Sequence, residues 1–280
     1  MTAATRPVPP RLQDVSVELT AGVATVLLDR PEAGNAWTIP LALEMSRAMT
    51  WCDETDEVRA VVLGARGRVF CVGADLSGRD ILKPGATKEV PEAQVGEWML
   101  PSAVRKPVVA ALQGHAVGIG TTYALHCDLR FVAEDATMGL PFVRRGIVPE
   151  ANASWLLPRI VGLGTAMDLV LTGRLVRGRE AVELGLAHRA LPKDRVLVEA
   201  QEWAAQVAAD GAPLALGVAK RLLWDGQVGT SAASRDAEHA AFTALAAGAD
   251  VTEGVASFLE KRSPQWTQGV SRDWPAELGS

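Results

Sequence analysis

The sequence is poor in cysteine and histidine and has no long block of one charge. Its three cysteines, Cys52, Cys71 and Cys127, are scattered and form no CxxC pair, which excludes a disulfide framework. The four histidines are equally dispersed, so we expect no structural metal site. The net charge is −5 and no basic cluster is present, which argues against nucleic-acid binding.

Long apolar runs are also absent. No uninterrupted apolar segment is long enough to span a bilayer, and the proline-rich segment 1–11 lacks the apolar core of a signal peptide. We therefore expect a cytoplasmic protein with no membrane association, and a disordered tail over residues 1–11. The 280 residues, 48% of them hydrophobic, are enough for a sizeable core in one or two domains.

Strand and helix patterns alternate over the first two thirds of the chain. Residues 15–29 predict a hairpin that turns at Ala21-Gly22, and Thr38 is placed to cap a helix over 38–51. Apolar runs at 58–63, 107–112 and 128–133, with a weaker one at 186–191, are typical of buried strands. Helical patterns at 120–127, 151–161 and 165–172 lie between them, so we predict an α/β fold with parallel strands covered by helices.

From about residue 193 only helical patterns remain, at 195–209, 213–224, 231–247 and 252–261. We therefore expect an α/β core over residues 12–192, a helical region over 193–265 and a tail over 266–280. The chain has no GxGxxG after its first strand and no GxxxxGK[ST], which argues against a nucleotide-binding fold.

Two glycine turns are the first candidates for chemistry, Gly73-Ala74-Asp75 and Gly118-Ile119-Gly120. A main-chain amide at a helix N-terminus has no partner within the helix and carries partial positive charge. Two such amides that point at one oxygen form an oxyanion hole. Each turn alone is explained equally well by a glycine that eases a loop, and Asp75 by a cap on a short helix after it.

The order and spacing of many other residues resemble the crotonase superfamily, also called the enoyl-CoA hydratase/isomerase family. The matching segments run from about residue 15 to residue 262 and include Arg30-Pro31 with Asn35-Ala36, Gly67-x-x-Phe70-x-x-Gly73-Ala74-Asp75-Leu76, Lys106-Pro107, Gly114-His115-Ala116-x-Gly118-x-Gly120, Cys127-Asp128, Leu171-Thr172-Gly173-Arg174, and Glu253-Gly254 through Arg262. The resemblance implies a right-handed spiral of repeated ββα units with a helical C-terminal trimerisation region. It also implies an acyl-CoA thioester as substrate, with coenzyme A as part of that substrate and no separate cofactor, and a homotrimer or dimer of trimers.

The resemblance also assigns roles to residues. It implies that the oxyanion-hole amides are those of Ala74 and Ile119. It places the following at positions that bind substrate or coenzyme A: Ala33, Asp75, Leu76, Gly118, Phe142, Phe258 and Lys261. For Lys261, a solvated lysine at a helix end is an equally good explanation.

The acid is where the sequence departs from the hydratases of the family. Their two glutamates, aligned on Cys127-Asp128, correspond to Thr122 and Phe142, and neither side chain transfers protons usefully. Glu150 lies where the resembling isomerases carry a single acid, so we expect it to be catalytic. The residues alone favour an acid that complements the dipole of the following helix. Catalysis requires apolar surroundings that raise its pKa, and Leu140, Phe142 and Trp155 are the candidates.

Three functions fit this pattern. The first is an isomerase that moves a double bond from Δ3 to Δ2 with Glu150 as the proton carrier. The second is a hydratase in which Glu150 activates water, and the third is a non-catalytic acyl-CoA-binding protein. We expect the irregular segment 78–100 to form the variable wall of the acyl pocket.

Overall fold

The computed structural model describes residues 7–76 and 98–278, so most of the predicted pocket wall and the first residues of the predicted N-terminal tail lie outside the described residues. The chain begins with the predicted hairpin, formed by β1 (Val15–Thr20) and β2 (Val23–Leu28). Its turn residues Ala21 and Gly22 have positive φ angles of 49° and 81°.

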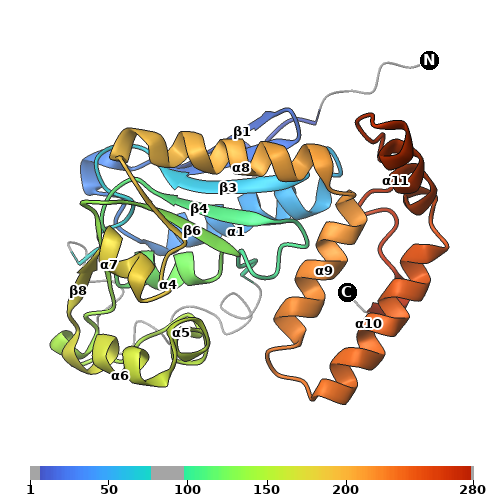
Figure 1. The fold of residues 1–280 in the computed structure, drawn as a ribbon. Coiled ribbons are helices and arrows are strands. Elements are labelled where there is room, and N and C mark those ends of the chain that lie inside the picture. Colours follow the sequence, from blue (N-terminus) through green and yellow to red (C-terminus); the bar gives the residue numbers. More distant parts are fainter. Residues whose placement is uncertain (1–6, 77–97, 279–280) are drawn as a thin grey trace.

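A six-stranded sheet forms the centre of the molecule (Figure 1). After the hairpin it adds β3 (Ala60–Ala65), β4 (Val108–Leu112), β6 (Leu129–Ala133) and β9 (Arg189–Leu191), in the order β1-β2-β3-β4-β6-β9. Every pair after the hairpin is parallel, as predicted. All residues of β3 and β4 are buried, which explains why these strands read as continuous apolar runs.

A second sheet contains three short strands that the sequence does not predict. They are β5 (Ala116–Val117), β7 (Thr137–Gly139) and β8 (Leu175–Arg177), in the order β5-β7-β8. The chain passes from β4 in the first sheet to β5 in the second, then back to β6 and out to β7. This alternation winds the chain as a spiral and confirms the predicted α/β architecture.

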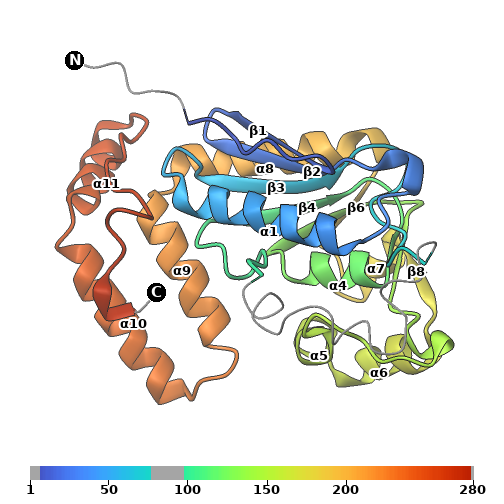
Figure 2. The same cartoon turned by 180° about the vertical axis from the view of Figure 1, so that it is seen from behind.

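Helices cover both faces of the central sheet. The helix α1 (Ile39–Glu54) lies on one face and α8 (Val196–Asp210) on the other (Figures 1 and 2). Thr38 caps α1 as predicted, with Oγ1 accepting a hydrogen bond of 3.2 Å from the amide of Leu41. The buried side of α8 is formed by Val196, Ala200, Ala204 and Ala208, and small side chains allow a helix to lie close to a sheet.

The remaining helices lie around this core. They are α4 (Ile119–Leu125), α5 (Ala153–Val161), α6 (Leu163–Thr172) and α7 (Gly178–Glu183), with 3-10 turns η1 (Pro31–Ala33), η2 (Val143–Arg145), η3 (Lys193–Arg195) and η4 (Ala276–Leu278). Three further helices, α9 (Pro213–Asp225), α10 (Ser231–Ala246) and α11 (Ala249–Glu260), form one end of the molecule (Figure 1). Leu214, Val218 and Ala241 form a small apolar cluster of their own there. None of the helices described is long and apolar enough to cross a membrane.

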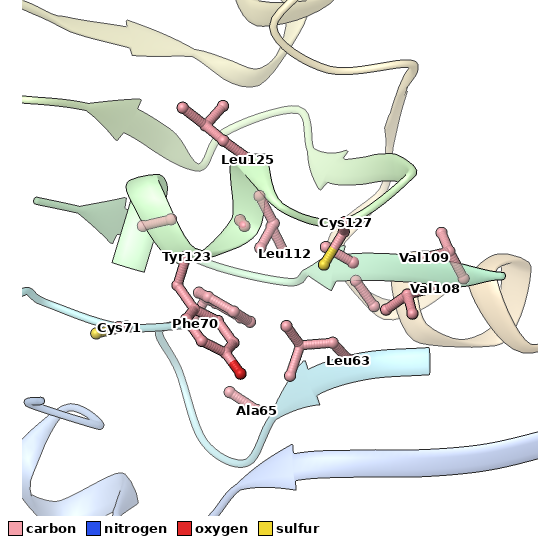
Figure 3. Packing of buried hydrophobic residues seen from close by; sticks show 14 of the residues in the cluster. Leu63, Ala65, Phe70, Cys71, Val108, Val109, Leu112, Tyr123, Leu125 and Cys127 are labelled. Carbon is pink, nitrogen blue, oxygen red and sulfur yellow. The ribbon is translucent and has the colours of Figure 1, made fainter. Parts of the chain in front are cut away.

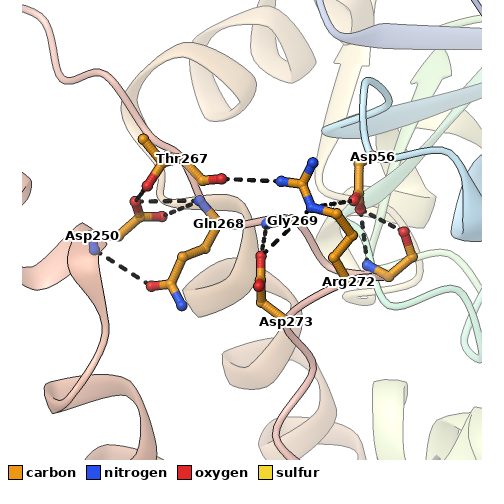
Figure 4. A network of polar contacts seen from close by, with 8 residues as sticks. Asp56, Asp250, Thr267, Gln268, Gly269, Arg272 and Asp273 are labelled. Carbon is orange, nitrogen blue, oxygen red and sulfur yellow. Dashed lines mark hydrogen bonds and ion pairs between the residues drawn. The ribbon is translucent and has the colours of Figure 1, made fainter.

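The segment after α11 returns to the core, although the sequence predicts a tail from residue 266. Figure 4 shows Arg272 meeting Asp56, which lies between α1 and β3, with 3.4 Å between Nε of Arg272 and Oδ2 of Asp56. The Asp56 carboxylate accepts hydrogen bonds from the Ser271 amide at 2.9 Å and the Ser271 hydroxyl at 2.7 Å. Asp250 at the start of α11 accepts a bond of 2.8 Å from the Thr267 amide, so the segment links α11 to the core.

Candidate active site

The two predicted glycine turns lie against each other. The amides of Phe70 and Cys71 both donate to the carbonyl oxygen of His115 at 3.0 Å, and the Val117 amide donates to the carbonyl oxygen of Cys71 at 3.0 Å. A β-carbon on Gly118 would lie 3.9 Å from the Cα of Gly73. Backbone hydrogen bonds therefore hold residues 70–74 beside residues 115–119.

Both amides assigned to the oxyanion hole are without a hydrogen-bond partner in the described part of the chain. Around Ala74, the carbonyl oxygen of Gly73 accepts from the Trp37 amide at 2.8 Å, and the Asp75 amide donates to the carbonyl oxygen of Trp37 at 2.9 Å, so the Ala74 amide is skipped. Ile119 is the first residue of α4, where an amide has no intrahelical acceptor. The turns thus offer two main-chain donors from adjacent segments.

The Gly118 turn depends on glycine for its conformation. Gly118 has φ 57° and ψ −123°, a combination that residues with a β-carbon rarely adopt. The ring of Phe142 lies 3.8 Å from the position of a Gly118 β-carbon, and only 8% of Phe142 is exposed. Phe142 therefore lies beside this turn.

The acid Glu150 is bonded to Thr122. The hydroxyl of Thr122 donates to Oε1 of Glu150 at 2.8 Å, across 28 residues of sequence. Thr122 is fully buried on α4, while Glu150 is accessible to solvent with its carboxylate surrounded by protein on the other sides. Burial raises the pKa of Glu150 above its ordinary value, and the hydrogen bond from Thr122 opposes that rise.

The backbone after Glu150 differs from the prediction of a helix that starts at residue 151. Ala151 and Asn152 have φ angles of 51° and 57°, which a right-handed helix does not accommodate, and α5 begins at Ala153. Glu150 therefore precedes the helix by three residues instead of lying in its first turn. This weakens the explanation that Glu150 is there only to complement the dipole of α5.

His126 holds this left-handed segment in place. Its Nε2 lies 2.8 Å from the carbonyl oxygen of Ala151 and its Nδ1 lies 2.9 Å from Oγ of Ser102. A carbonyl oxygen only accepts, so Nε2 carries the proton and Nδ1 of the neutral ring accepts from Ser102. Burial lowers the pKa of His126, which favours that neutral ring.

Ile119 and Thr122 of α4 and His126, the residue that caps its C-terminus, lie on one side of the helix, since they are spaced i, i+3 and i+7. Neither contact, that of Thr122 or that of His126, is predicted from the sequence. The available signal was the spacing of Thr122 and His126, four residues apart, which places both on one side of a helix. Tyr123 of the same helix points the other way into the core, toward Phe70 (Figure 3), and its ring lies 4.8 Å from that of Trp37.

The other predicted residues are distributed more widely. Asp75 lies 3.7 Å from the guanidinium of Arg30, and the helix that it was expected to cap lies outside the described residues. Ala33 is half-buried in η1, while 49% of Leu76 is exposed. Leu140 is fully buried in the core, and Trp155 is half-buried under the guanidinium of Arg159 at 4.1 Å.

The structure does not bring Phe258 and Lys261 to the two turns of the same chain. Phe258 is 82% exposed on α11, and Lys261 ends that helix with φ 54°. Figures 1 and 2 place α11 away from α4. Within residues 7–76 and 98–278, no group of three or more His, Cys, Asp or Glu side chains is arranged to hold a metal ion.

Comparison with known proteins gives one consistent family. The family model for enoyl-CoA hydratase/isomerase matches residues 18–269. The chain is 33% identical to an enoyl-CoA hydratase of Alternaria alternata over 88% of this chain and 83% of that one. It is 31% identical to the 1,2-epoxyphenylacetyl-CoA isomerase of Escherichia coli over 88% and 95%. The crystal structure of an enoyl-CoA hydratase from Bacillus anthracis superposes with a TM-score of 0.85 at 31% identity, over 91% of this chain and 99% of that one. The chain therefore belongs to the enoyl-CoA hydratase/isomerase family of acyl-CoA enzymes.

Proposed function

We propose that the protein is an isomerase that moves the double bond of an enoyl-CoA from Δ3 to Δ2. Glu150 is the proton carrier, and the amides of Ala74 and Ile119 bind the thioester oxygen. The observation that carries the proposal is the bond between Thr122 and Glu150, because α4 then holds the acid at the helix whose first residue supplies one of the two free amides.

The reaction needs one base and one site for negative charge. Glu150 takes a proton from C2, and the electron pair of that C–H bond forms an enolate whose oxygen the two amides stabilise. The same carboxyl group then returns the proton to C4, and the double bond comes to rest between C2 and C3. No second acid and no cofactor besides the coenzyme A of the substrate is required.

The surroundings of Glu150 support this role. A base that must also act as an acid works best with a pKa near the working pH, and burial moves the pKa of Glu150 in that direction. The two positions where the hydratases of the family carry glutamates hold Thr122 and Phe142, so of these three positions only that of Glu150 supplies a carboxylate.

Hydration is the second candidate, because one of the relatives above is named an enoyl-CoA hydratase. In that reaction Glu150 takes a proton from water, the hydroxide adds to C3, and the same proton is delivered to C2. A relative of comparable identity is named a 1,2-epoxyphenylacetyl-CoA isomerase, so both hydratases and isomerases occur among the similar proteins.

The test is to give the purified protein a 3-enoyl-CoA and, separately, a 2-enoyl-CoA. We expect the 3-enoyl ester to become the conjugated 2-enoyl ester, and Glu150→Gln to lower kcat by about 10²–10⁴-fold. The matched control is Glu57→Gln, an exposed glutamate before β3, which we expect to keep wild-type turnover.

Each other outcome has one meaning. Turnover retained by Glu150→Gln removes Glu150 from the mechanism. Formation of a 3-hydroxyacyl-CoA from the 2-enoyl ester, without isomerisation, replaces the isomerase with a hydratase. Binding of both esters in calorimetry without either reaction identifies an acyl-CoA-binding protein.

We also propose that the protein forms a homotrimer or a dimer of trimers through its C-terminal helices. Large apolar side chains on α10 and α11 support this, since Phe242, Phe258 and Leu259 are 74%, 82% and 72% exposed. In such an assembly Phe258 and Lys261 would meet the coenzyme A bound by a neighbouring copy. Sedimentation equilibrium tests it, and a monomer at micromolar concentration contradicts it.

A further inference from the structure

We propose that Thr122 is the positioning residue of Glu150 and that its hydroxyl selects Oε2 as the oxygen that takes and returns the substrate proton. The proposal rests on the proposed function of Glu150 and names the group that controls it. Thr122 touches no reacting atom in this scheme and acts only through the carboxylate.

The geometry assigns different roles to the two carboxylate oxygens. Oε1 of Glu150 receives the Thr122 hydroxyl at 2.8 Å, and in the described part of the chain Oε2 has no hydrogen-bond partner. A carboxylate oxygen that accepts a hydrogen bond is less basic than a free one. The proton from substrate therefore goes to Oε2, and Oε1 remains the anchored oxygen.

The donor is held rigidly, which makes it an effective anchor. Thr122 is fully buried in α4, and a β-branched side chain in a helix has few rotamers. Its Oγ1 also lies 3.2 Å from the carbonyl oxygen of Ile119 in the preceding turn. A hydroxyl has one proton, so it donates to one acceptor at a time. The charged and closer Oε1 attracts this proton more strongly than the Ile119 carbonyl does, so the bond to Glu150 prevails.

Among the residues that the structure describes, no charged side chain competes with Thr122 for Glu150. In the described segments Glu150 has no ion pair, and the influences on its pKa are burial, which raises it, and the Thr122 bond, which lowers it. His126 on the same side of α4 is kept neutral by burial, which lowers its pKa. The arginines of η2 are bonded elsewhere, Arg144 to the carbonyl oxygen of Thr172 and Arg145 to that of Pro141.

A merely structural threonine would behave differently on substitution. Thr122→Val keeps the volume and removes the donor, so the ionised form of Glu150 loses the one hydrogen bond that it receives from residues 7–76 and 98–278. We expect the pKa of Glu150 to rise by about one unit. The acidic limb of the pH profile of kcat/KM should shift to higher pH by the same amount. In addition, kcat should fall about 10-fold with KM unchanged, because the carboxylate is less well aligned. Thr122→Ser keeps the donor and should restore most of both.

The experiment measures the pKa of Glu150 directly by carbon-13 NMR on protein labelled at the glutamate carboxyl carbon, with the resonance assigned by its loss in Glu150→Gln. Thr243→Val is the matched control. Thr243 lies on α10, is exposed, and donates to a main-chain carbonyl of its own helix at 2.8 Å. If Thr122→Val does not fold, the smaller Thr122→Ala replaces it, with circular dichroism as the check.

The outcomes separate this proposal from the proposed function. An unchanged pKa of Glu150 in Thr122→Val, or failure of Thr122→Ser to restore it, overturns the role of Thr122 even if Glu150 is essential. Full turnover by Glu150→Gln overturns the proposed function, and with it the catalytic meaning of the anchor, whatever the NMR titration gives. Both proposals are supported if Thr122→Val raises the pKa of Glu150 and shifts the acidic limb of kcat/KM to higher pH, and if Thr122→Ser restores both values.

Discussion

Gly120 lies so close to Cys71 that no side chain fits between them. A β-carbon on Gly120 would be 2.7 Å from the β-carbon of Cys71 and 2.9 Å from its carbonyl oxygen. Cys71 is fully buried and its strand segment leads to the Ala74 turn. The contact therefore sets the distance between the two segments that carry the proposed oxyanion-hole amides.

Gly120→Ala tests this distance. The added methyl group must push α4 away from Cys71, so we expect a loss of about 1–3 kcal/mol in the free energy of unfolding and a lower kcat. The matched control is Gly164→Ala on α6, where a β-carbon meets nothing within 4 Å. It should be neutral or stabilising by up to about 1 kcal/mol. Equal effects of the two alanines in urea unfolding would contradict the packing argument.

Gly118→Ala separates strain from crowding. The position has room for a methyl group, with nearest atoms at 3.8 and 3.9 Å, but its φ of 57° with ψ of −123° disfavours any β-carbon. We expect a cost of about 1–3 kcal/mol, or a backbone that relaxes and turns the Ile119 amide away. Either way kcat should fall more than the affinity for an acyl-CoA ester, measured by calorimetry. An alanine variant with wild-type kcat would remove the Ile119 amide from the mechanism.

The raised pKa of Glu150 has a consequence for stability. The folded protein binds this proton more tightly than the unfolded chain does, so raising the pH from the ordinary value of 4.5 to the folded value reduces stability. Glu150→Gln does not titrate. As the pH rises through this window, the free energy of unfolding of Glu150→Gln should therefore increase relative to that of the wild type. At higher pH the difference between the two should stay constant.

Urea unfolding from about pH 4 to pH 8 makes the comparison. Glu57→Gln, again the exposed control, should show no such gain. Curves of wild type and Glu150→Gln that stay parallel through the window would mean that burial does not shift the pKa of Glu150.

Asp56 anchors the C-terminal segment in a pH-dependent way. Burial raises the pKa of Asp56, but the two bonds from Ser271 and the charge of Arg272 outweigh it, so the pKa lies below its ordinary value of 3.8. The stabilisation is present above that value and lost as the pH falls through the folded pKa. Asp56→Ala should cost about 1–3 kcal/mol and speed amide exchange around Val270. Unchanged exchange there would show that the segment is held by other contacts.

Phe258→Ala tests the assignment of that residue to coenzyme A. Because its side chain is 82% exposed, the stability of the isolated chain should not change. We expect KM for an acyl-CoA to rise about 10-fold, which corresponds to the burial of one aromatic side chain against the ligand. Phe242→Ala on α10, 74% exposed, is the control. Sedimentation of both variants distinguishes a lost ligand contact from a lost subunit contact, and an unchanged KM contradicts the assignment.

The central strands β3 and β4 could be predicted from the sequence because all their consecutive residues are buried. β3 and β4 are buried on both faces, so each appears as an unbroken apolar run. β5 and β7 have two and three residues, too few to show a period, and they exist only because the spiral places them side by side.

Part of the candidate site could likewise be predicted from the sequence, and part could not. The glycines of the turns mark backbone conformations that few other residues adopt, so Gly73 and Gly118 could be found in the sequence. The contact between Thr122 and Glu150 depends on how the chain turns at Ala151 and Asn152, two residues in a left-handed conformation with no glycine to signal it. In the sequence, Thr122 was therefore noted only as the residue at a position where the hydratases of the family carry a glutamate.

The position of α8 in the chain affects how the protein is synthesised. The strands β1 to β6 are complete at residue 133, but the helix that covers one face of their sheet begins at Val196. At about 5–20 residues per second, the ribosome needs roughly 3–12 s to make the residues between them. During that interval an apolar sheet face of the nascent chain is exposed to the cell. That face of the sheet is therefore covered only after α8 has been made, well after the strands beneath it.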